Sequence, residues 1–549
     1  MSSSIVRPAV LALALGGLAG CGGGGGGSEP PAPPPPTPPA VDVSPVAAAD
    51  PGSALPEGWQ HGAFMEIFVR SYQDSDGDGV GDLKGLVSRL DYLADLGVKG
   101  LWLMPVTASQ DHDHGYAVAD YRGIEAAYGS LADLDELLAQ AHARGIGVVL
   151  DYVMNHSAAT HPLFQNARAS SANPYRDWYV WQASAPVGWS VFGANPWRHW
   201  TGAEAGAGYY YAPFWDQMPD FNLTHPAVLA HHQDNLRFWL NRGVDGFRFD
   251  AVGMLVENGP TAWESQPQNY TIMKGMQDLL AGYQRRTMVC EAPADPQGFG
   301  AASACGGAFA FDLSASLVDA ARGDTAAIAA ASRYHASAPA GMKTFLSNHD
   351  SFAGQRLWDQ LGGNTAQYRL AAASALLLPG TPFIYYGEEI GLAGAASLDG
   401  DPRLRTPMSW TGDTLRAGFS TGTPYRALSA NVATNNAQSQ QADPQSLHAF
   451  YKAMLALRNG HASIAGGSYE QPFASGQAWG FQRAGGGERT LVVFNTATHA
   501  TALTVAALPP RASLHALYPA DGTGASADDA GTARLDLAPQ SVRVYQVAP

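Results

Sequence analysis

A short apolar segment, residues 246–252, carries two charged side chains that share one face. Arg248 and Asp250 stand two apart in a run that otherwise has the character of a buried strand, and a period of two puts both side chains on the same side. Burying either charge alone would be costly, so the two either neutralise one another structurally or share a wet, functional cavity. From this segment alone, both interpretations are equally good.

Three further apolar runs end in residues of the kinds that do chemistry. They are Asp151 to His156, Cys290 followed by Glu291, and Asn348 to Asp350. Because the functional residues of parallel strands lie at the carboxyl ends of those strands, four such ends predict one shared site. Carboxylates gathered in this way suit nucleophilic and acid–base chemistry, so the functional interpretation is favoured.

Taken in order, these segments resemble the four signature regions of the alpha-amylase family of retaining glycoside hydrolases. Hydrolysis with retention needs two carboxylates about 5 to 5.5 Å apart, one nucleophilic and one able to donate a proton. The resemblance implies that Asp250 is the nucleophile, Glu291 the general acid and base, and Asp350 the residue that holds the distorted sugar. Arg248 would keep Asp250 ionised, whereas neighbouring carboxylates would raise the pKa of Glu291.

The resemblance also implies which side chains bind the substrate. His156 and His349 are expected to hydrogen-bond sugar hydroxyls. Tyr116 is the expected aromatic platform under the reacting sugar, and Arg248 and Arg405 complete the substrate-binding set. A lone histidine or tyrosine is more often structural, so these roles depend on the position of each residue within its motif.

Near-continuous apolar strands alternate with amphipathic helices from residue 63 to residue 458, which is typical of parallel βα units. The expected strands are residues 63–72, 98–106, 146–153, 246–252, 287–291, 309–313, 343–347 and 383–386. We therefore predict an α/β fold, a (β/α)8 TIM barrel with its catalytic residues at the C-terminal ends of the strands.

At 549 residues the chain is too long for one compact core. We predict a signal peptide at 1–21, a Gly/Pro-rich tether at 22–58, the catalytic barrel at 59–460 and a C-terminal antiparallel β-sandwich domain at 461–549. Residues 157–225 interrupt the alternation of strands and helices. A loop of that length must be functional or form a small domain. The resemblance identifies it as a B domain, inserted after the third strand, that walls one side of the substrate cleft.

The N-terminal segment has one basic residue, a short apolar run and the sequence Leu18 to Cys21. Its end resembles a bacterial lipoprotein box, in which Cys21 is acylated; the alternative is an ordinary cleaved signal with a chance cysteine. We therefore expect a lipid-anchored protein of the outer membrane that faces the periplasm or the cell surface. In that oxidising compartment, Cys290 and Cys305 form either a disulfide or two independent buried thiols.

The loop from residue 74 to residue 82 presents four carboxylates on a glycine-bent backbone. Hard oxygen ligands at this spacing favour Ca²⁺, and the resemblance adds a main-chain carbonyl. The predicted ligands are Asp74, Asp76, Asp78, Val80 and Asp82. The alternative is a solvated acidic turn.

A formal net charge of −16 excludes nucleic acid as a partner, because the chain cannot neutralise a row of phosphates. The leading interpretation is an alpha-amylase, a monomer that hydrolyses α-1,4-glucosidic bonds of starch, maltodextrins or malto-oligosaccharides. The alternative within the same chemistry is an α-glucosidase or an α-glucosyl transglycosylase acting on short oligosaccharides. A catalytically inactive, glucan-binding relative is a third class, and the presence of all three carboxylates argues against it.

Overall fold

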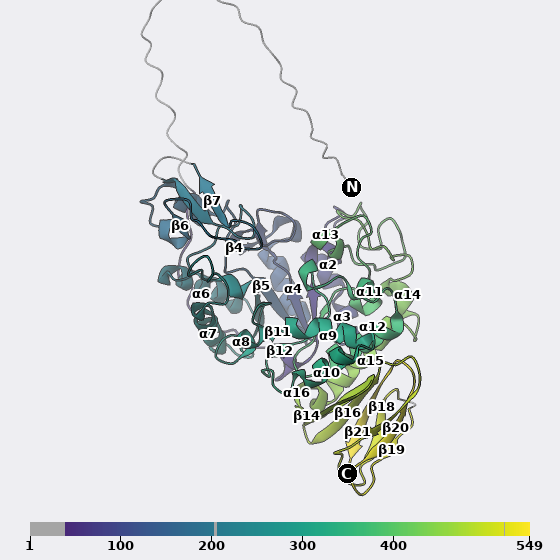
Figure 1. Ribbon diagram of the computed structural model, residues 1–549. Helices are drawn as coiled ribbons and strands as arrows, with labels where there is room; N and C mark the ends of the chain where they lie inside the picture. Colours follow the sequence, from purple (N-terminus) through teal and green to yellow (C-terminus); the bar gives the residue numbers. More distant parts are fainter. Residues whose placement is uncertain (1–38, 202–205, 521) are drawn as a thin grey trace, which may run out of the picture. The chain divides into compact units, whose positions relative to one another are not determined.

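The computed structural model describes residues 39–201, 206–520 and 522–549, and a parallel sheet of eight strands lies at its centre (Figure 1). The strands are β1 (Phe64–Ile67), β2 (Gly100–Leu103), β5 (Gly147–Tyr152), β9 (Gly246–Phe249), β10 (Thr287–Cys290), β11 (Ala308–Phe309), β12 (Met342–Lys343) and β13 (Phe383–Tyr385). Their order is β12-β11-β10-β9-β5-β2-β1-β13. The backbone N–H of Phe383 donates to the Thr344 carbonyl oxygen at 2.8 Å, which joins the two edges and closes the predicted barrel.

Helices follow the strands around the barrel (Figure 1). The longer ones are α4 (Leu131–Ala143), α6 (Pro226–Asn241), α7 (Pro267–Ala281), α9 (Phe311–Ala321), α10 (Thr325–Tyr334), α12 (Thr365–Leu377) and α15 (Leu447–Gly460). The shorter ones include α1 (Val69–Tyr72), α2 (Leu83–Ser88), α3 (Leu90–Leu96), α5 (Pro162–Ala169), α8 (Pro296–Gly300), α11 (Leu357–Gln360), α13 (Gly400–Leu404), α14 (Ala437–Gln441) and α16 (Ala462–Gly466). None of the helices in the described part of the chain combines the length and the apolar character that spanning a bilayer requires.

The interior of the barrel changes from apolar to polar along the strands. Its apolar layer is built from Trp59, Phe64, Trp102, Val149, Val289, Phe309, Phe345 and Phe383. Alternate residues of a strand share a face, so Glu66 and Asp151 point inward one step beyond Phe64 and Val149. The register then sets Asp151 beside Arg248 of β9. Polar side chains therefore gather at the C-terminal end of the barrel, as the sequence predicts.

The segment after β5 forms a small domain with a three-stranded sheet, ordered β6 (Trp181–Gln182), β8 (Gly208–Tyr211) and β7 (Trp197–Trp200). Asn155, just beyond β5, links it to the barrel. Its side-chain amide donates to Asp220 Oδ2 at 2.9 Å, and its carbonyl oxygen accepts from the N–H of Phe221 at 2.9 Å. A hairpin of β3 (Thr107–Ser109) and β4 (Val118–Ile124) lies after β2.

The C-terminal domain contains an antiparallel sheet of β14 (Ser468–Ser475), β15 (Ala478–Gly485), β16 (Glu488–Asn495), β21 (Ser541–Ala548), β18 (Ser513–Tyr518) and β19 (Ala525–Ser526). A second sheet pairs β17 (Thr501–Val505) with β20 (Ala533–Leu537). Successive side chains of β16 point to opposite faces of the sheet, and this explains how the C-terminal domain packs against the rest of the protein. Leu491 and Val493 enter the core between the two sheets, whereas Val492 and Phe494 join the main core of the protein.

Several predicted boundaries are wrong. The strand expected at 63–72 ends at Ile67 and helix α1 follows it; the strand expected at 309–313 ends at Phe309, and helix α9 begins at Phe311. Short apolar runs fit a buried helix as well as a strand, which explains both errors. The predicted signal peptide, the acylation of Cys21 and most of the tether lie outside the described residues.

A buried arginine ties the end of the barrel together. Arg458 of α15 is fully buried, and its guanidinium group donates to main-chain carbonyl oxygens rather than to a carboxylate. The acceptors are the carbonyl oxygens of His61, Leu376, Leu378, Gly380 and Ala465. Burial lowers the pKa of Arg458 to about 9. This one side chain therefore satisfies carbonyl groups at the ends of three separate segments.

Replacing Arg458 with methionine should lower the free energy of unfolding by about 3 kcal/mol, because several buried carbonyl oxygens would lose their donors. Urea unfolding followed by circular dichroism measures this change. The matched control is Arg416→Met at an exposed position, which should leave the urea midpoint almost unchanged. Equal midpoints for the two variants would contradict the structural role given to Arg458.

Candidate active site

One guanidinium group connects the carboxylates at the end of the barrel. Arg248 is 1% exposed, and its Nη1 lies 2.7 Å from Asp250 Oδ1 and 2.8 Å from Asp151 Oδ1. Its Nη2 lies 2.6 Å from Glu291 Oε2. Strands β5, β9 and β10 are neighbours in the sheet, and each supplies one part of this cluster. The structure thus brings the predicted nucleophile and the predicted general acid to the same cation.

Burial changes the protonation behaviour of both of these carboxyl groups. Burial raises the pKa of Asp250 to about 6, although Arg248 acts in the opposite direction. Burial also raises the pKa of Glu291 to about 7, with Asp250 and Asp350 adding to the effect. The N–H of Ala251 donates to Glu291 Oε2 at 3.0 Å, from a backbone with φ of +46°. Both carboxyl groups can therefore exchange a proton closer to neutral pH than an ordinary carboxyl group can.

Asp350 is held by two cations. His349 Nε2 lies 3.0 Å from Asp350 Oδ2, and Arg405 Nη2 lies 2.9 Å from Asp350 Oδ1. Arg405 Nη2 also lies 3.2 Å from Asp401 Oδ2. Burial acts to raise the pKa of Asp350, but the charges of His349 and Arg405 outweigh it and hold that pKa well below its usual range. Asp350 is therefore a permanent anion at the site.

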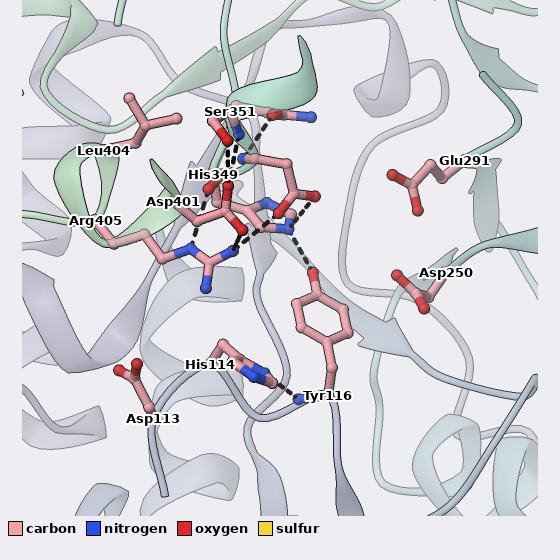
Figure 2. Close-up of polar contacts among 12 residues, drawn as sticks. Asp113, His114, Tyr116, Asp250, Glu291, His349, Ser351, Asp401, Leu404 and Arg405 are labelled. Carbon is pink, nitrogen blue, oxygen red and sulfur yellow. Dashed lines mark hydrogen bonds and ion pairs between the residues drawn. The ribbon is translucent and has the colours of Figure 1, made fainter. Parts of the chain in front are cut away.

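These side chains surround a cavity of about 650 Å³, a volume typical of small-molecule sites. Figure 2 shows Asp250 and Glu291 on one side of this region, with Asp401 and Arg405 on the other. The predicted residues that line the cavity are Tyr116, His156, Asp250, Glu291, Asp350 and Arg405. Burial lowers the pKa of His156 to about 4, so its imidazole is neutral and keeps an acceptor nitrogen.

Two predicted substrate-binding residues lie behind the cavity wall instead. Arg248 is enclosed by the carboxylates that it pairs with, and His349 is fully buried between Glu66, Asp350 and Tyr116. Both side chains act here on the carboxylates of the site.

Aromatic side chains form much of the cavity mouth. Phe192 is 65% exposed, Phe214 and Trp215 are each 41% exposed, and Phe352 is 62% exposed. Phe192 and Phe214 pack together with ring centroids 5.7 Å apart. Exposed apolar groups concentrated at a cavity mouth indicate a binding surface.

The structure joins Cys290 and Cys305 by a disulfide, with the two Cα atoms 6.3 Å apart. Cys290 is the last residue of β10 and directly precedes Glu291. The bond therefore fastens the strand that carries the predicted general acid to the segment that follows α8.

The acidic loop brings three of its predicted ligands together. Carboxylate oxygens of Asp74, Asp76 and Asp78 lie within 4.8 Å of one another, as the ligands of one hard cation must. The N–H of Val80 donates to Asp78 Oδ1 at 2.7 Å. Gly79 has φ of +92°, and a Cβ there would lie 2.0 Å from the Thr423 carbonyl oxygen, so the loop requires glycine.

Asp82 does not join this group. Its Oδ1 accepts from the N–H of Gly85 at 2.7 Å and from Ser75 Oγ at 2.8 Å, and its Oδ2 accepts from the N–H of Ser75 at 2.8 Å. The side chain thereby caps helix α2. Its placement just before a helix was the sequence signal for this role.

Sequence reasoning missed Glu66, which lies on β1 and contacts His349, and the role of Asp401 beside Arg405. It also passed over Asp151 as an ion-pair partner of Arg248. The sequence did contain a signal for Glu66. It is an acidic residue in an otherwise apolar strand, and burying its charge would be as costly as burying Arg248 or Asp250 without a partner.

Known proteins resemble this chain over most of its length. The family model for the alpha amylase catalytic domain matches residues 66–467. Alpha-amylase 3 of Dictyoglomus thermophilum is 33% identical over 434 residues, which cover 76% of this chain and 80% of that protein. An alpha-glucosidase of Pediococcus pentosaceus is 30% identical over 505 residues, which cover 78% of this chain and 89% of that protein.

Among solved structures, that of the alpha-glucosyl transfer enzyme XgtA superposes with a TM-score of 0.77 at 29% identity, covering 90% of this chain and 99% of that one. The closed parallel barrel, the carboxylates around Arg248 and these similarities lead to one conclusion. The chain belongs to the alpha-amylase family of glycoside hydrolases, enzymes that act on O-glycosyl bonds.

Proposed function

We propose that this enzyme acts on the non-reducing ends of short α-glucosides, as an α-glucosidase with α-glucosyl transfer as a second outcome. The starch alpha-amylase interpretation of the sequence becomes the less favoured one. The observation that carries the proposal is the pair of ion contacts from Arg405 to Asp350 and Asp401, which lies across the cavity from Glu291 and would close that end.

The closed end lies where a longer sugar chain would have to continue. Glu291 would protonate the leaving oxygen, so the departing sugar leaves on its side of the cavity. Arg405 and Asp401 lie on the opposite side of the region (Figure 2). Arg405 is 5% exposed and its contact with Asp350 is largely buried, so breaking that ion pair costs about 3–5 kcal/mol; the contact with the 39% exposed Asp401 adds less. A glucan whose chain extended past Asp350 would therefore pay that cost, whereas a terminal glucosyl unit would not.

Ion pairs also hold the segment that carries His114 of the cavity lining. Asp113, next to His114 of the cavity lining, lies 2.7 Å from Arg426 Nη2 and 3.8 Å from Arg70 Nε. A segment with two cations on one carboxylate is not easily displaced by a sugar.

The catalytic roles follow from the charges of the site. Asp250, ionised, would attack the anomeric carbon while Glu291 gives its proton to the leaving oxygen, forming a glucosyl ester. Glu291 would then take a proton from an incoming water as the water attacks and releases Asp250. Two displacements at one carbon preserve the α configuration. The fixed negative charge of Asp350 would stabilise the positive charge that develops on the sugar ring.

Transfer replaces that water by a sugar hydroxyl. The exposed rings of Phe192, Phe214, Trp215 and Phe352 at the mouth favour an acceptor sugar, whose apolar face can pack against them. The similarity to XgtA, an alpha-glucosyl transfer enzyme, supports the same outcome.

The acidic loop is proposed to bind Ca²⁺ through the carboxylates of Asp74, Asp76 and Asp78, with the Val80 carbonyl as a further ligand. The convergence of three carboxylates supports this proposal, and the capping role of Asp82 removes one of the ligands first expected. The ion would stabilise the loop beside β1 and would take no part in bond cleavage.

A blocked substrate tests the position of attack. The enzyme should hydrolyse 4-nitrophenyl α-maltoheptaoside only from its free non-reducing end, so a 4,6-ethylidene group on that end should abolish hydrolysis. Chromatography of the products reports the result, with a commercial endo-amylase as the positive control. The first sugar released from the unblocked substrate should be glucose, as its α anomer by NMR. Comparable cleavage of the blocked substrate would contradict the proposal.

The pH dependence of kcat/KM should be bell-shaped, with a maximum between about 6 and about 7. Activity should fall below that range as Asp250 is protonated, and above it as Glu291 loses its proton. With α-glucosyl fluoride, whose leaving group needs little protonation, Glu291→Gln should retain the rate of the first step. In this variant kcat/KM should no longer fall at high pH, because the group that loses its proton there has been removed. If kcat/KM of Glu291→Gln still fell at high pH, Glu291 would not be the general acid.

Chelation should lower the unfolding temperature, because Ca²⁺ at 100 times its Kd stabilises the folded state by about 2.7 kcal/mol through linkage. Asp76→Asn and Asp78→Asn should each reduce bound calcium, measured by elemental analysis, and should shrink the effect of chelator. Asp177→Asn, at an exposed position elsewhere, is the matched control. A chelator-insensitive protein without bound calcium would contradict the site.

A further inference from the structure

Glu66 stands at the inner end of a chain of contacts that leads to the reaction site. It is 1% exposed, belongs to β1, and its Oε1 lies 2.5 Å from His349 Nδ1. On the other side of the same ring, His349 Nε2 lies 3.0 Å from Asp350 Oδ2. Glu66 is absent from the cavity lining, so it can act on the substrate only through His349.

The neighbouring hydrogen bonds fix the proton on one nitrogen of this ring. Tyr116 Oη donates to Asp151 Oδ2 at 2.9 Å and accepts from Arg248 Nη1 at 3.2 Å. Its single proton is therefore used, yet Tyr116 Oη lies only 2.7 Å from His349 Nε2. The other neighbour of Nε2 is the ionised Asp350, which can only accept. Nε2 must then carry a hydrogen atom.

The second nitrogen faces a carboxylate. At Nδ1 the proton belongs either to the imidazole, which is then a cation beside ionised Glu66, or to Glu66, which is then neutral. Burial alone would lower the pKa of His349, but Asp350 and Glu66 outweigh burial and raise it to about 10. Burial raises the pKa of Glu66, and the nearby imidazolium acts against that shift.

The ring is held so that it cannot turn toward the sugar. Tyr116 stacks on it with ring centroids 5.5 Å apart and planes 18° apart, and Trp102 meets it edge-on at 5.7 Å. Arg405 Nε donates to the main-chain carbonyl oxygen of His349 at 3.0 Å. The charged or titratable groups that face this residue are thus Glu66, Asp350, Tyr116, Arg405 and, beyond Tyr116, Asp151.

We propose that Glu66 is a positioning residue that keeps His349 doubly protonated, so that a fixed imidazolium holds Asp350 ionised and oriented toward the sugar. A neutral imidazole could still donate one hydrogen bond to Asp350, but it would supply no charge. The proposal uses only the chemistry of the family, and it rests on the proposed function solely for the choice of substrate.

The charge of His349 can be measured on the free enzyme. Imidazole ¹⁵N spectra of protein labelled at histidine should show one residue, assigned by its loss in His349→Asn, that stays doubly protonated from pH 5 to pH 9. In Glu66→Gln this residue should lose a proton within that range. A singly protonated His349 at pH 7 in the unmodified enzyme would overturn the proposal, as would an unchanged spectrum in folded Glu66→Gln.

Kinetics provide an independent readout with 4-nitrophenyl α-glucoside. Glu66→Gln should lower kcat more than it changes KM, with a loss of about 10- to 100-fold at pH 8, because a charged hydrogen bond is lost in the transition state. The loss should be smaller at pH 5, where His349 is protonated even without Glu66. Glu66→Asp, which restores the charge, should recover part of kcat and should retain the doubly protonated ring.

Glu389→Gln is the matched control, since this glutamate is equally buried in the same barrel and its carboxylate pairs with Tyr92 and the N–H of Gly387. Its activity relative to the unmodified enzyme should not change with pH. The same constant ratio in Glu66→Gln would reduce Glu66 to a structural role and overturn the proposal. If the unmodified enzyme fails to cleave α-glucosides, the proposed function is wrong, and the histidine spectra still decide the role of Glu66.

Discussion

Three buried carboxylates share the single positive charge of Arg248, and the catalytic end of the barrel depends on this imbalance. Burial acts to lower the pKa of Arg248, but the surrounding carboxylates outweigh it and raise that pKa, so the cation is permanent and the carboxyl groups must adjust around it. Asp151 and Asp250 lie at one end of the guanidinium group and Glu291 at the other, and burial raises the pKa of each of these carboxyl groups despite the cation. One cation thus holds together the two carboxyl groups that are proposed to act as nucleophile and acid.

Contacts across the chain connect this centre to its surroundings. Asp74 of the acidic loop accepts from Ser420 Oγ at 2.5 Å, and the N–H of Tyr425 donates to the Gly79 carbonyl oxygen at 2.9 Å. The next residue, Arg426, pairs with Asp113, which directly precedes His114 of the cavity lining. The loop, the segment after residue 418 and the wall therefore form one continuous support.

The barrel and its principal carboxylates could be predicted from the sequence, because each lies where an apolar strand meets a polar motif. The contacts that control them could not. Glu66 and His349 are 283 residues apart, and nothing local in the sequence pairs them. A motif also leaves open whether a side chain reaches the cavity. His349 matches a sugar-binding position, yet it is fully buried and Tyr116 stacks on it. At Asp82 a local preference decides instead. Its spacing within the acidic loop suggested a calcium ligand, but its side chain caps helix α2.

If the enzyme acts on chain ends as proposed, the contacts of Arg405 with Asp350 and Asp401 make the number of glucan ends, rather than the mass of glucan, the measure of substrate supply. A cavity closed behind the reacting sugar admits one terminus of each linear glucan, whatever the length of that glucan. At equal mass, a polymer then presents few usable termini, a mixture of short oligosaccharides presents many, and branching multiplies them. The quantity that such a cavity responds to is the molar concentration of termini, so digestion of a long polymer by other enzymes would increase its supply without adding any sugar.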